Sequence, residues 1–329
     1  MSSIERVIIF RALKLGDMLC SIPAIRGVRN AFPSAHIALA GHPQMGLLFS
    51  RYKHYIDEFI PFAGFPGMPE SPPNPLGVWE TIRDIQNKRF DMAIQLHGSG
   101  ELSNPLISLF NAKSSIGHYR QGHYRPEQGF FKLYPENTHE IDRCLSLLDV
   151  IGVDSKDRTL EFSLIDEDFS LLQSDLSFSK NLKTKPYICL HPGASSASKC
   201  WSPQNFALLA DWLSEKGVDV VFTGSSLESP LIDNIRSLMK CQSYEVASNN
   251  LSLGPLGALI KKSSGLICND TGVSHLAAAL KVSSIVLFIQ TDPDRWAPLN
   301  KKLHQWLMNP SVEEVRKIAQ EFLLKEMAL

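Results

Sequence analysis

Short apolar runs alternate along this chain with longer stretches in which apolar residues recur every three or four positions. The runs of the first half lie at Val7–Phe10, His36–Ala40, Met92–Leu96 and Ser115–Gly117. The stretches with helical spacing between them lie at about 18–30, 77–88, 103–110 and 139–151. A short apolar run indicates a buried strand, and the longer spacing indicates a helix with one buried face. Strands that alternate with helices predict an α/β fold built on a parallel sheet.

The same alternation begins again in the second half of the chain. Its apolar runs lie at Tyr187–Leu190, Asp219–Thr223, Tyr244–Ala247, Leu266–Asn269 and Ser284–Phe288. A final helix is expected at about 311–327, with its apolar residues along one face. The region from 152 to 185 loses this periodicity and is expected to link the two halves. The pattern therefore predicts two α/β domains.

A turn from strand to helix at Asp270, Thr271 and Gly272 is the strongest candidate for chemistry. The first amides of a helix have no partner inside the helix and lie at the positive end of its dipole. A glycine at this point leaves room for a phosphate to approach those amides. The simpler alternative is that Asp270 or Thr271 only caps the helix, because both are good cap residues.

Two other turns have the same strand-to-helix form. His191–Trp201 follows an apolar run and contains small residues with one cation, Lys199, which is suited to phosphate binding. The alternative for this segment is a flexible surface loop with a solvated lysine. Near the amino end, Asp17 lies where the run Val7–Phe10 gives way to a helix. It is expected either to cap that helix or to act as a general base at the carboxyl edge of the sheet.

Taken in order, these segments closely resemble glycosyltransferase family 9, which contains the ADP-heptose:lipopolysaccharide heptosyltransferases. The resemblance runs from about residue 7 to residue 299. The matching residues are Leu15–Asp17, Ile22–Arg26, His191–Gly193, Ser198–Trp201, Thr223 with Gly224, Glu228, Asn269–Gly272, His275–Ala279 and Asp292 with Pro293.

The resemblance implies a GT-B fold, in which two Rossmann-like domains with parallel sheets face each other across a cleft. An acceptor-side domain is expected at 1–172, a nucleotide-sugar-binding domain at 173–310, and a helix at 311–329 that crosses back to the first domain. The implied reaction moves a heptose or related sugar from a nucleotide diphosphate donor, ADP-heptose, to a lipopolysaccharide-core or related surface-glycan acceptor. It inverts the anomeric centre and uses neither a metal ion nor a cofactor.

The resemblance also assigns roles to residues. Asp17 is expected to be the base, and Lys199 to balance the charge that develops on the departing diphosphate. The expected donor-binding residues are His191, Ser195, Thr223, Glu228, Asp270, Thr271, Gly272 and His275. An exposed glutamate in the first turn of a helix is the alternative for Glu228, and a packed helix histidine is the alternative for His275.

Acceptor recognition is assigned to residues that follow strands of the first half. His97 lies beyond the run that ends at Leu96, and Arg120 and Arg125 belong to a short basic loop with interleaved aromatic residues. These groups suit a lipid-linked or oligosaccharide acceptor that carries carboxylates or phosphates. A solvated loop is the alternative for the two arginines.

Composition and charge exclude some classes of protein and indicate a location in the cell. A net charge of −1 at pH 7 argues against a nucleic-acid-binding protein. The six cysteines are scattered and lack the spacing of a metal site. We expect no signal peptide and no apolar segment long enough to span a bilayer, so the sequence indicates a cytoplasmic protein. Peripheral contact with the inner face of the cytoplasmic membrane is compatible with this location. The oligomeric state is not indicated.

Three alternatives from other classes stay open. One is an epimerase or phosphorylase that acts on nucleotide sugars on a similar scaffold, and another is a protein that binds nucleotide sugar without catalysis. A dinucleotide-dependent oxidoreductase is disfavoured because no Gly-x-Gly-x-x-Gly motif follows Val7–Phe10.

Overall fold

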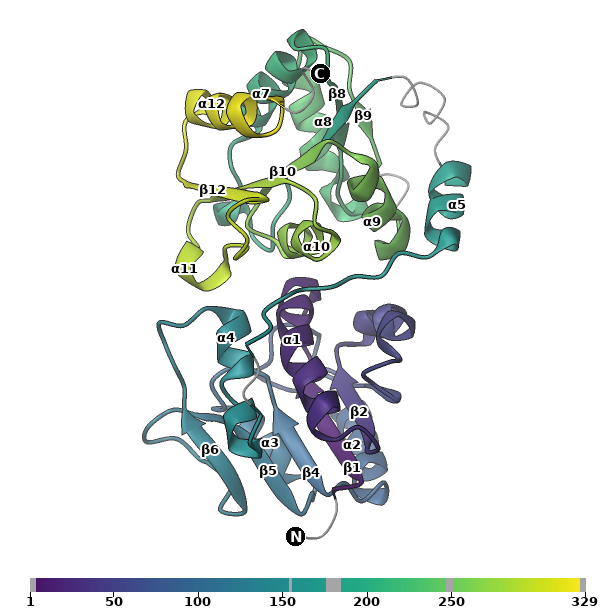
Figure 1. Cartoon of the computed structure of the whole chain (residues 1–329), viewed down its shortest axis with the longest axis vertical. Helices are drawn as coiled ribbons and strands as arrows, with labels where there is room; N and C mark the ends of the chain where they lie inside the picture. The colour runs from purple at the N-terminus through teal and green to yellow at the C-terminus, as the bar shows by residue number, and fades with distance from the viewer. Residues whose placement is uncertain (1–3, 154–155, 176–184, 247–250, 326–329) are drawn as a thin grey trace. The chain divides into compact units, whose positions relative to one another are not determined.

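The chain folds into two compact units, Met1–Leu160 and Glu161–Leu329 (Figure 1). The computed structural model describes residues 4–153, 156–175, 185–246 and 251–325. In this part of the chain, no helix is long and apolar enough to cross a membrane.

The first unit is built on a six-stranded sheet in the order β3-β2-β1-β4-β5-β6, and each neighbouring pair is parallel. Val7 of the central strand pairs with Ile37 on one side and with Met92 on the other. The strands are β1 (Arg6–Arg11), β2 (His36–Gly41), β3 (Glu58–Pro61), β4 (Met92–Gln95), β5 (Ser114–Tyr119) and β6 (Gly129–Leu133).

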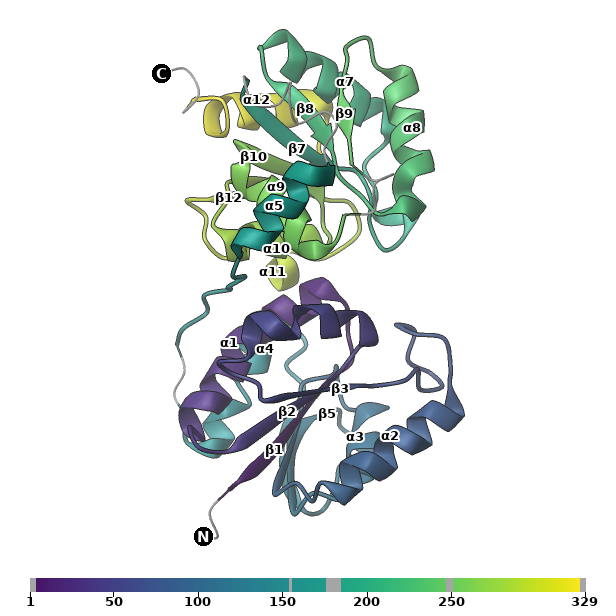
Figure 2. The same ribbon diagram turned by 90° about the vertical axis from the view of Figure 1, so that its right-hand side faces the viewer.

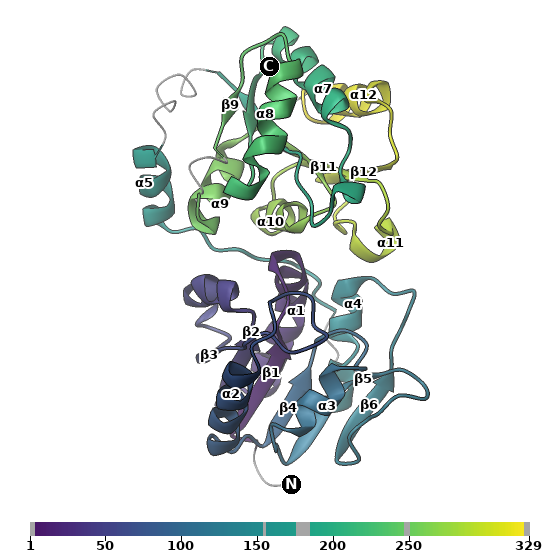
Figure 3. The same ribbon diagram turned by 180° about the vertical axis from the view of Figure 1, so that it is seen from behind.

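Helices cover both faces of this sheet. Figure 1 shows α1 (Leu15–Ala31) and α4 (Glu140–Leu145) in front of it, and Figure 3 shows α2 (Pro75–Asn87) and α3 (Ser103–Ser108) on the opposite face. Two 3-10 helices, η1 (Pro43–Tyr52) and η2 (Leu148–Ile151), complete the unit. Because β1 is covered on both faces, its four central residues, Val7–Phe10, are all apolar instead of alternating with polar residues.

The second unit repeats this architecture. Its sheet has the order β12-β11-β10-β7-β8-β9, and all neighbouring strands are parallel. In each sheet the first strand lies at the centre, and later strands are added first on one side of it and then on the other. The strands are β7 (Tyr187–His191), β8 (Asp219–Phe222), β9 (Tyr244–Glu245), β10 (Gly265–Asn269), β11 (Ser284–Phe288) and β12 (His304–Met308). The helices are α5 (Asp166–Asp175), α7 (Pro203–Glu215), α8 (Ser229–Leu238), α9 (Leu253–Lys262), α10 (Gly272–Leu280), α11 (Pro293–Trp296) and α12 (Val312–Phe322), with 3-10 helices η3 (Ala197–Lys199) and η4 (Ser226–Glu228).

The boundary between the units lies earlier than the expected position at 172. Helix α5 packs beside α9 of the second unit, as Figure 2 shows. Phe162 is buried next to Gly257 of α9, and Lys262 lies over the ring of Phe169 at 5.2 Å. The apolar and cation-π contacts of these residues therefore place the segment after Leu160 in the second unit.

The packing of the last helix also differs from the expectation that residues 311–329 cross back to the first domain. Val315, Ala319 and Leu323 of this segment are buried in one cluster with Phe206 and Leu209 of α7. The apolar face of α12 is thus satisfied within the second unit, and the last four residues, 326–329, lie outside the described residues.

The predicted central elements are present, with ends that differ by a few residues. The sequence did not predict β3, β6 or β12, nor helices α5, α8 and α9 as separate elements. Of the predicted run Tyr244–Ala247, the structure forms a strand over Tyr244–Glu245, and Ala247 lies outside the described residues. Both units are Rossmann-like, with a change of strand order between β1 and β4 and between β7 and β10.

Candidate active site

Two loops meet at the carboxyl edge of the second sheet, after the neighbouring strands β7 and β10. Asn269, at the end of β10, is fully buried. Its Oδ1 accepts from the backbone N–H of Trp201 at 3.0 Å, and its Nδ2 donates to the carbonyl of Pro192 at 2.6 Å. One amide side chain therefore holds both ends of the lysine-bearing loop against the start of α10. The sequence analysis did not assign Asn269 a role, although an asparagine directly after a buried apolar run is a signal of this kind.

The predicted phosphate-binding turn begins α10. Thr271 is the N-cap residue with an extended backbone, and among the described residues its side chain makes no capping hydrogen bond. The backbone N–H and the hydroxyl of Ser274 both donate to the carbonyl of Thr271, at 3.0 and 2.8 Å. Of the two residues in the capping alternative, Asp270 and Thr271, the second holds the N-cap position but its side chain does not bond to the helix amides that the structure describes. The amides of Gly272 and Val273 lie at the positive end of the helix.

Lys199 lies within electrostatic reach of this turn. Burial raises the pKa of the Asp270 carboxyl, and the positive charge of Lys199 acts in the opposite direction. Lys199 ends the short helix η3 and is only partly exposed. The loop of Lys199 and the start of α10 are joined through Asn269, and their binding of a phosphate stays a prediction. Ser195, in the same loop, is exposed.

His191, Thr223 and Glu228 form a second cluster at this edge. The Nδ1 atom of His191 lies 3.0 Å from the Thr223 hydroxyl, and its Nε2 lies 3.9 Å from Oε1 of Glu228. Burial lowers the pKa of His191, while the carboxylate of Glu228 acts against this shift. The Oε2 atom of Glu228 accepts from the N–H and hydroxyl of Ser225, at 2.7 and 2.8 Å. Glu228 thus stabilises the start of η4 with one oxygen and faces His191 with the other.

The aromatic residues near these loops pack against one another. His275 is buried, and its ring packs edge-on against Trp296 with centroids 6.1 Å apart. Trp201 is buried against Phe206, and its indole N–H donates to the carbonyl of Pro310 at 2.8 Å. The structure therefore shows His275 buried at the start of α10, and its role in donor binding stays a prediction.

In the first unit, Asp17 lies in the first turn of α1, whereas Lys14 is the N-cap residue. Its side chain is 30% exposed, and its Oδ1 lies 3.6 Å from an Nη atom of Arg11. Arg11 is fully buried at the end of β1 and also forms an ion pair with Glu140 at 3.1 Å. Glu140 in turn pairs with Arg143. Asp17 is therefore an accessible carboxylate with a buried network of charges behind it, and the sequence analysis named neither Arg11 nor Glu140 as part of the site.

The three residues expected to bind the acceptor differ in their availability. His97 is buried against Phe10, and its Nδ1 accepts from the N–H of Ala12 at 3.2 Å. Burial and the nearby Arg11 lower the pKa of His97 to about 3. With this lowered pKa His97 is neutral at ordinary pH, and its role in acceptor binding stays a prediction.

The two arginines of the basic loop also have partners of their own. Arg120 forms ion pairs with Glu101 at 2.6 Å and with Glu136 at 2.9 Å. Its positive charge is thus already balanced, which leaves little for an acceptor anion. Arg125 is exposed and lies over the ring of Tyr119 at 4.9 Å.

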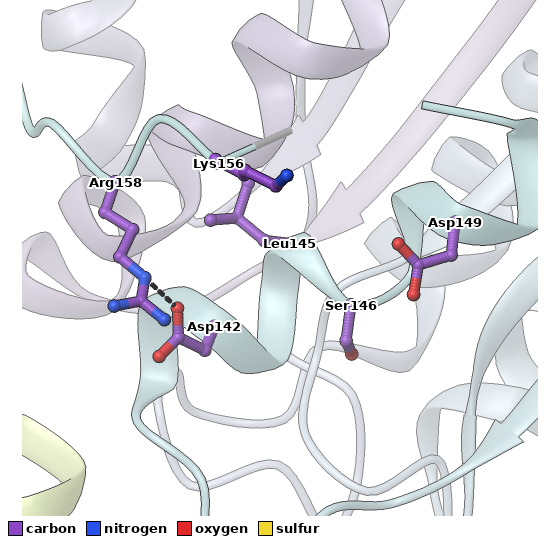
Figure 4. Close-up of a pocket in the computed structure, with 6 residues that line it drawn as sticks. All are labelled: Asp142, Leu145, Ser146, Asp149, Lys156 and Arg158. Atoms are coloured by element: carbon purple, nitrogen blue, oxygen red, sulfur yellow. Dashed lines mark ion pairs between the residues drawn. The ribbon is translucent and has the colours of Figure 1, made fainter. Parts of the chain in front are cut away.

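A surface cavity of about 360 Å³ lies beside α4 and η2 (Figure 4). Arg158 pairs with Asp142 at 2.6 Å in its wall, and Asp149 pairs with Lys132 at 2.9 Å. The cavity contains none of the predicted site residues. Its lining consists of Asp142, Leu145, Ser146, Asp149, Lys156 and Arg158.

Comparison with known proteins places this arrangement in a family. The profile of glycosyltransferase family 9 (heptosyltransferase) matches residues 78–322. The chain belongs to this family. As a family 9 glycosyltransferase it is an enzyme, and its pair of six-stranded Rossmann-like domains is of GT-B type, as the sequence predicts.

Relatives of this family 9 enzyme match over most of its length. Lipopolysaccharide heptosyltransferase 3 of Escherichia coli is 24% identical, and the match covers 88% of this chain and 85% of that protein. Lipopolysaccharide heptosyltransferase 2 of Salmonella typhimurium is 26% identical, with 92% and 88% covered.

Solved structures show the same fold. A family 9 glycosyltransferase from Veillonella parvula superposes with a TM-score of 0.84 at 23% identity, covering 99% of each chain. E. coli ADP-heptose lps heptosyltransferase II superposes with a TM-score of 0.77 at 20% identity, covering 98% of this chain and 99% of that one.

Proposed function

We propose that this enzyme transfers a heptose from ADP-heptose to an acceptor of the lipopolysaccharide core, with inversion of the anomeric centre. The observation that carries the proposal is the arrangement at the end of β10. There Asn269 ties the loop of Lys199 to the start of α10. The names of the relatives supply the sugar and the acceptor class.

The donor is bound by the second unit. Lys199 contributes a positive charge, and the first amides of α10, at Gly272 and Val273, point toward the diphosphate. Glu228 accepts hydrogen bonds from the ribose hydroxyls with the oxygen that faces His191. The buried Thr223 holds His191 through its hydroxyl, so the wall beside the ribose is rigid.

Asp17 supplies the base from the first unit. As the acceptor oxygen forms its bond to the anomeric carbon, the hydroxyl proton passes to the Asp17 carboxylate. The bond from that carbon to the diphosphate breaks on the opposite face, and its electron pair remains on the phosphate oxygen. Attack opposite the leaving group inverts the configuration. General-base catalysis of this kind is worth about 10²–10⁴-fold in rate.

Basic residues of the first unit bind anionic groups of the acceptor. Arg125 is the exposed cation of the predicted acceptor loop, and Arg120 reaches an acceptor only by exchanging its partners Glu101 and Glu136. We place the reaction at the cytoplasmic face of the inner membrane, where a lipid-linked core would present its sugars.

A ligand panel followed by a transfer assay tests the proposal. The melting temperature is measured with ADP, UDP and GDP and with their sugar conjugates, including ADP-heptose. A ligand at 100 times its dissociation constant stabilises the folded protein by about 2.7 kcal/mol. We expect the largest shift with ADP-heptose, and heptose transfer, seen by mass spectrometry, to a truncated lipopolysaccharide core that lacks heptose.

The same assay separates the alternatives. Consumption of ADP-heptose at equal rate without any acceptor would indicate an epimerase or phosphorylase. Tight binding of the nucleotide sugar without turnover on any core acceptor would indicate a binding protein. The configuration of the new glycosidic bond, measured by NMR, decides whether the transfer inverts.

A further inference from the structure

The guanidinium of Arg11 joins three parts of the first unit at the point where the strand order changes. Its Nε and Nη2 atoms donate to the backbone carbonyl of Asp17, at 3.2 and 2.7 Å. Its Nη1 atom donates to the carbonyl of Leu96, which directly follows β4. Since Arg11 itself ends β1, one planar fork fixes the first turn of α1 against the carboxyl ends of two neighbouring strands.

Arg11 is held from behind by α4. Its Nη2 atom donates to Glu140 at 3.1 Å, and the other carboxylate oxygen of Glu140 pairs with Arg143. Arg143 also donates to the carbonyl of Thr138 at 3.1 Å and lies over the ring of Tyr134 at 4.4 Å. Arg11, Glu140 and Arg143 are each at most 3% exposed, so this chain of charges is shielded from water.

Burial of charges at this depth calls for a reason. Moving an ion pair out of water costs free energy that its mutual attraction often only balances, so such pairs are weak evidence for stability alone. Of the two carboxylates that Arg11 contacts, that of Asp17 is 30% exposed and that of Glu140 is 4% exposed. The buried charges of Arg11, Glu140 and Arg143 therefore indicate a function other than stability.

We propose that Arg11 is a positioning residue for Asp17, held in place by Glu140 and Arg143. This inference rests on the proposed function, in which Asp17 is the base. Arg11 fixes the backbone that carries Asp17 and places a positive charge 3.6 Å from its carboxylate. That charge favours the ionised form, which is the form able to accept a proton.

Several other charged or titratable groups face this pair, and they come from each element packed around it. They are Cys20 from α1, His97 after β4, and Glu140 and Cys144 from α4. His97 is neutral, and burial raises the pKa of both thiols, that of Cys144 to about 12. Arg11 is therefore a positive charge next to both carboxylates, and Arg143 shares the balance of Glu140.

Substitutions of Arg11 test whether it positions Asp17 or only stabilises the folded protein. Arg11→Met keeps an apolar stem without charge or donors, and Arg11→Lys keeps the charge without the fork. The matched control is Arg29→Met on the last turn of α1. Arg29 likewise donates to backbone carbonyls, including that of Ala35 at 2.8 Å, and pairs with an acid, Asp57, at 2.5 Å.

We expect kcat to fall in Arg11→Met and to stay unchanged in the control, Arg29→Met. Arg11→Met should lower kcat about 10²-fold, the loss that a 1 Å misplacement can cause, with an unchanged dissociation constant for ADP. Arg11→Lys should retain more turnover than Arg11→Met. Arg29→Met should lower the melting temperature but leave kcat near that of the wild type. Equal kcat in the two methionine variants would overturn the proposal.

A titration gives a readout that needs no acceptor. The Asp17 carboxyl carbon is observed by NMR in protein labelled at aspartate, and its signal is assigned by its loss in Asp17→Asn. Its titration midpoint should rise in Arg11→Met, because the stabilising positive charge is gone, and return toward the wild-type value in Arg11→Lys. An unmoved midpoint in Arg11→Met would contradict the proposal.

Glu140→Gln covers the case in which Arg11→Met does not fold. It removes the counter-charge that holds Arg11 while keeping an acceptor oxygen, and kcat should fall with ADP affinity retained. Unchanged kcat in this variant would overturn the role of Glu140. If instead Asp17→Asn itself keeps wild-type turnover, the proposed base is wrong, and this result is distinct from a failure confined to Arg11.

Discussion

A β-carbon at Gly193 would lie 1.5 Å from the Oε1 atom of Glu228. That distance is far below van der Waals contact. The carboxylate of Glu228 therefore occupies space that is open only because residue 193 has no side chain. The two residues come from different strand-to-helix connections, after β7 and after β8. Their closeness shows that the carboxylate of Glu228 is held against the backbone of the lysine-bearing loop.

Gly193→Ala should therefore displace Glu228 and weaken donor binding. The obstructing atom is the end of a side chain, which can move at small cost to folding. We expect calorimetry to show a weaker affinity for ADP, with a melting temperature close to that of the wild type. In a matched control, Gly27→Ala, the new β-carbon would lie 2.3 Å from Cδ1 of Leu148, a side chain of the first unit that is buried and has less room to move than that of Glu228. That control should lose stability and keep its ADP affinity.

Lys199→Ala should weaken binding of ADP and slow transfer, whereas adenosine should bind the variant and the wild type about equally. A lysine supplies a point charge to phosphate and nothing to a base or ribose. Lys301→Ala removes an exposed lysine from another part of the same unit and should change neither affinity. An equal loss of adenosine and ADP binding would show that the loop itself had collapsed.

Asp17→Asn should lower turnover by at least about 10²-fold while leaving ADP binding nearly intact, because it removes proton acceptance and little else. The side chains are equal in size, and Arg11 keeps its bonds to the backbone carbonyl of residue 17. Steady-state kinetics and calorimetry on the same preparation check both halves of the prediction. Wild-type turnover in the variant would assign the base to another group.

The folded protein should lose stability as the pH falls from about 6.5 toward 4. Burial lowers the pKa of His118 and of His304 to about 4, and that of His97 to about 3, from an ordinary value of 6.5. Between these values the unfolded chain binds protons that the folded protein does not, so protonation favours unfolding. The stabilising contribution is complete above pH 6.5.

Urea unfolding at several pH values measures this loss. His304→Gln should make the free energy of unfolding less dependent on pH in the window, because one of the depressed groups is removed. A free energy of unfolding that stays constant from pH 6.5 to 5 would show that the three histidines titrate alike in the folded and unfolded states.

The sequence alone determined the central strands and the turns that follow them. The strand β1 is buried on both faces, and so are β4, β7 and β10, so each appears as a short apolar run. The residues after such strands lie at one edge of a parallel sheet. For this reason Asp17, His191, Lys199 and the Asp270–Gly272 turn could be named before any contact was known.

The tertiary structure alone decided the edge strands β3, β6 and β12 and the partners of the site residues. Among the described residues, each of β3, β6 and β12 pairs with a single neighbour, and each exposes part of its side chains. Phe130 and Leu133 of β6 are 64% and 59% exposed. Such strands are defined by pairing with a neighbour, which leaves no continuous apolar run in the sequence.

The contacts of Arg11 with Glu140, and of Asn269 with Pro192, join residues 129 and 77 positions apart. They arise because α4 packs beside α1 and because β7 lies beside β10 in the strand order of the second sheet. That order follows from how the whole sheet packs, and no local pattern of residues encodes it.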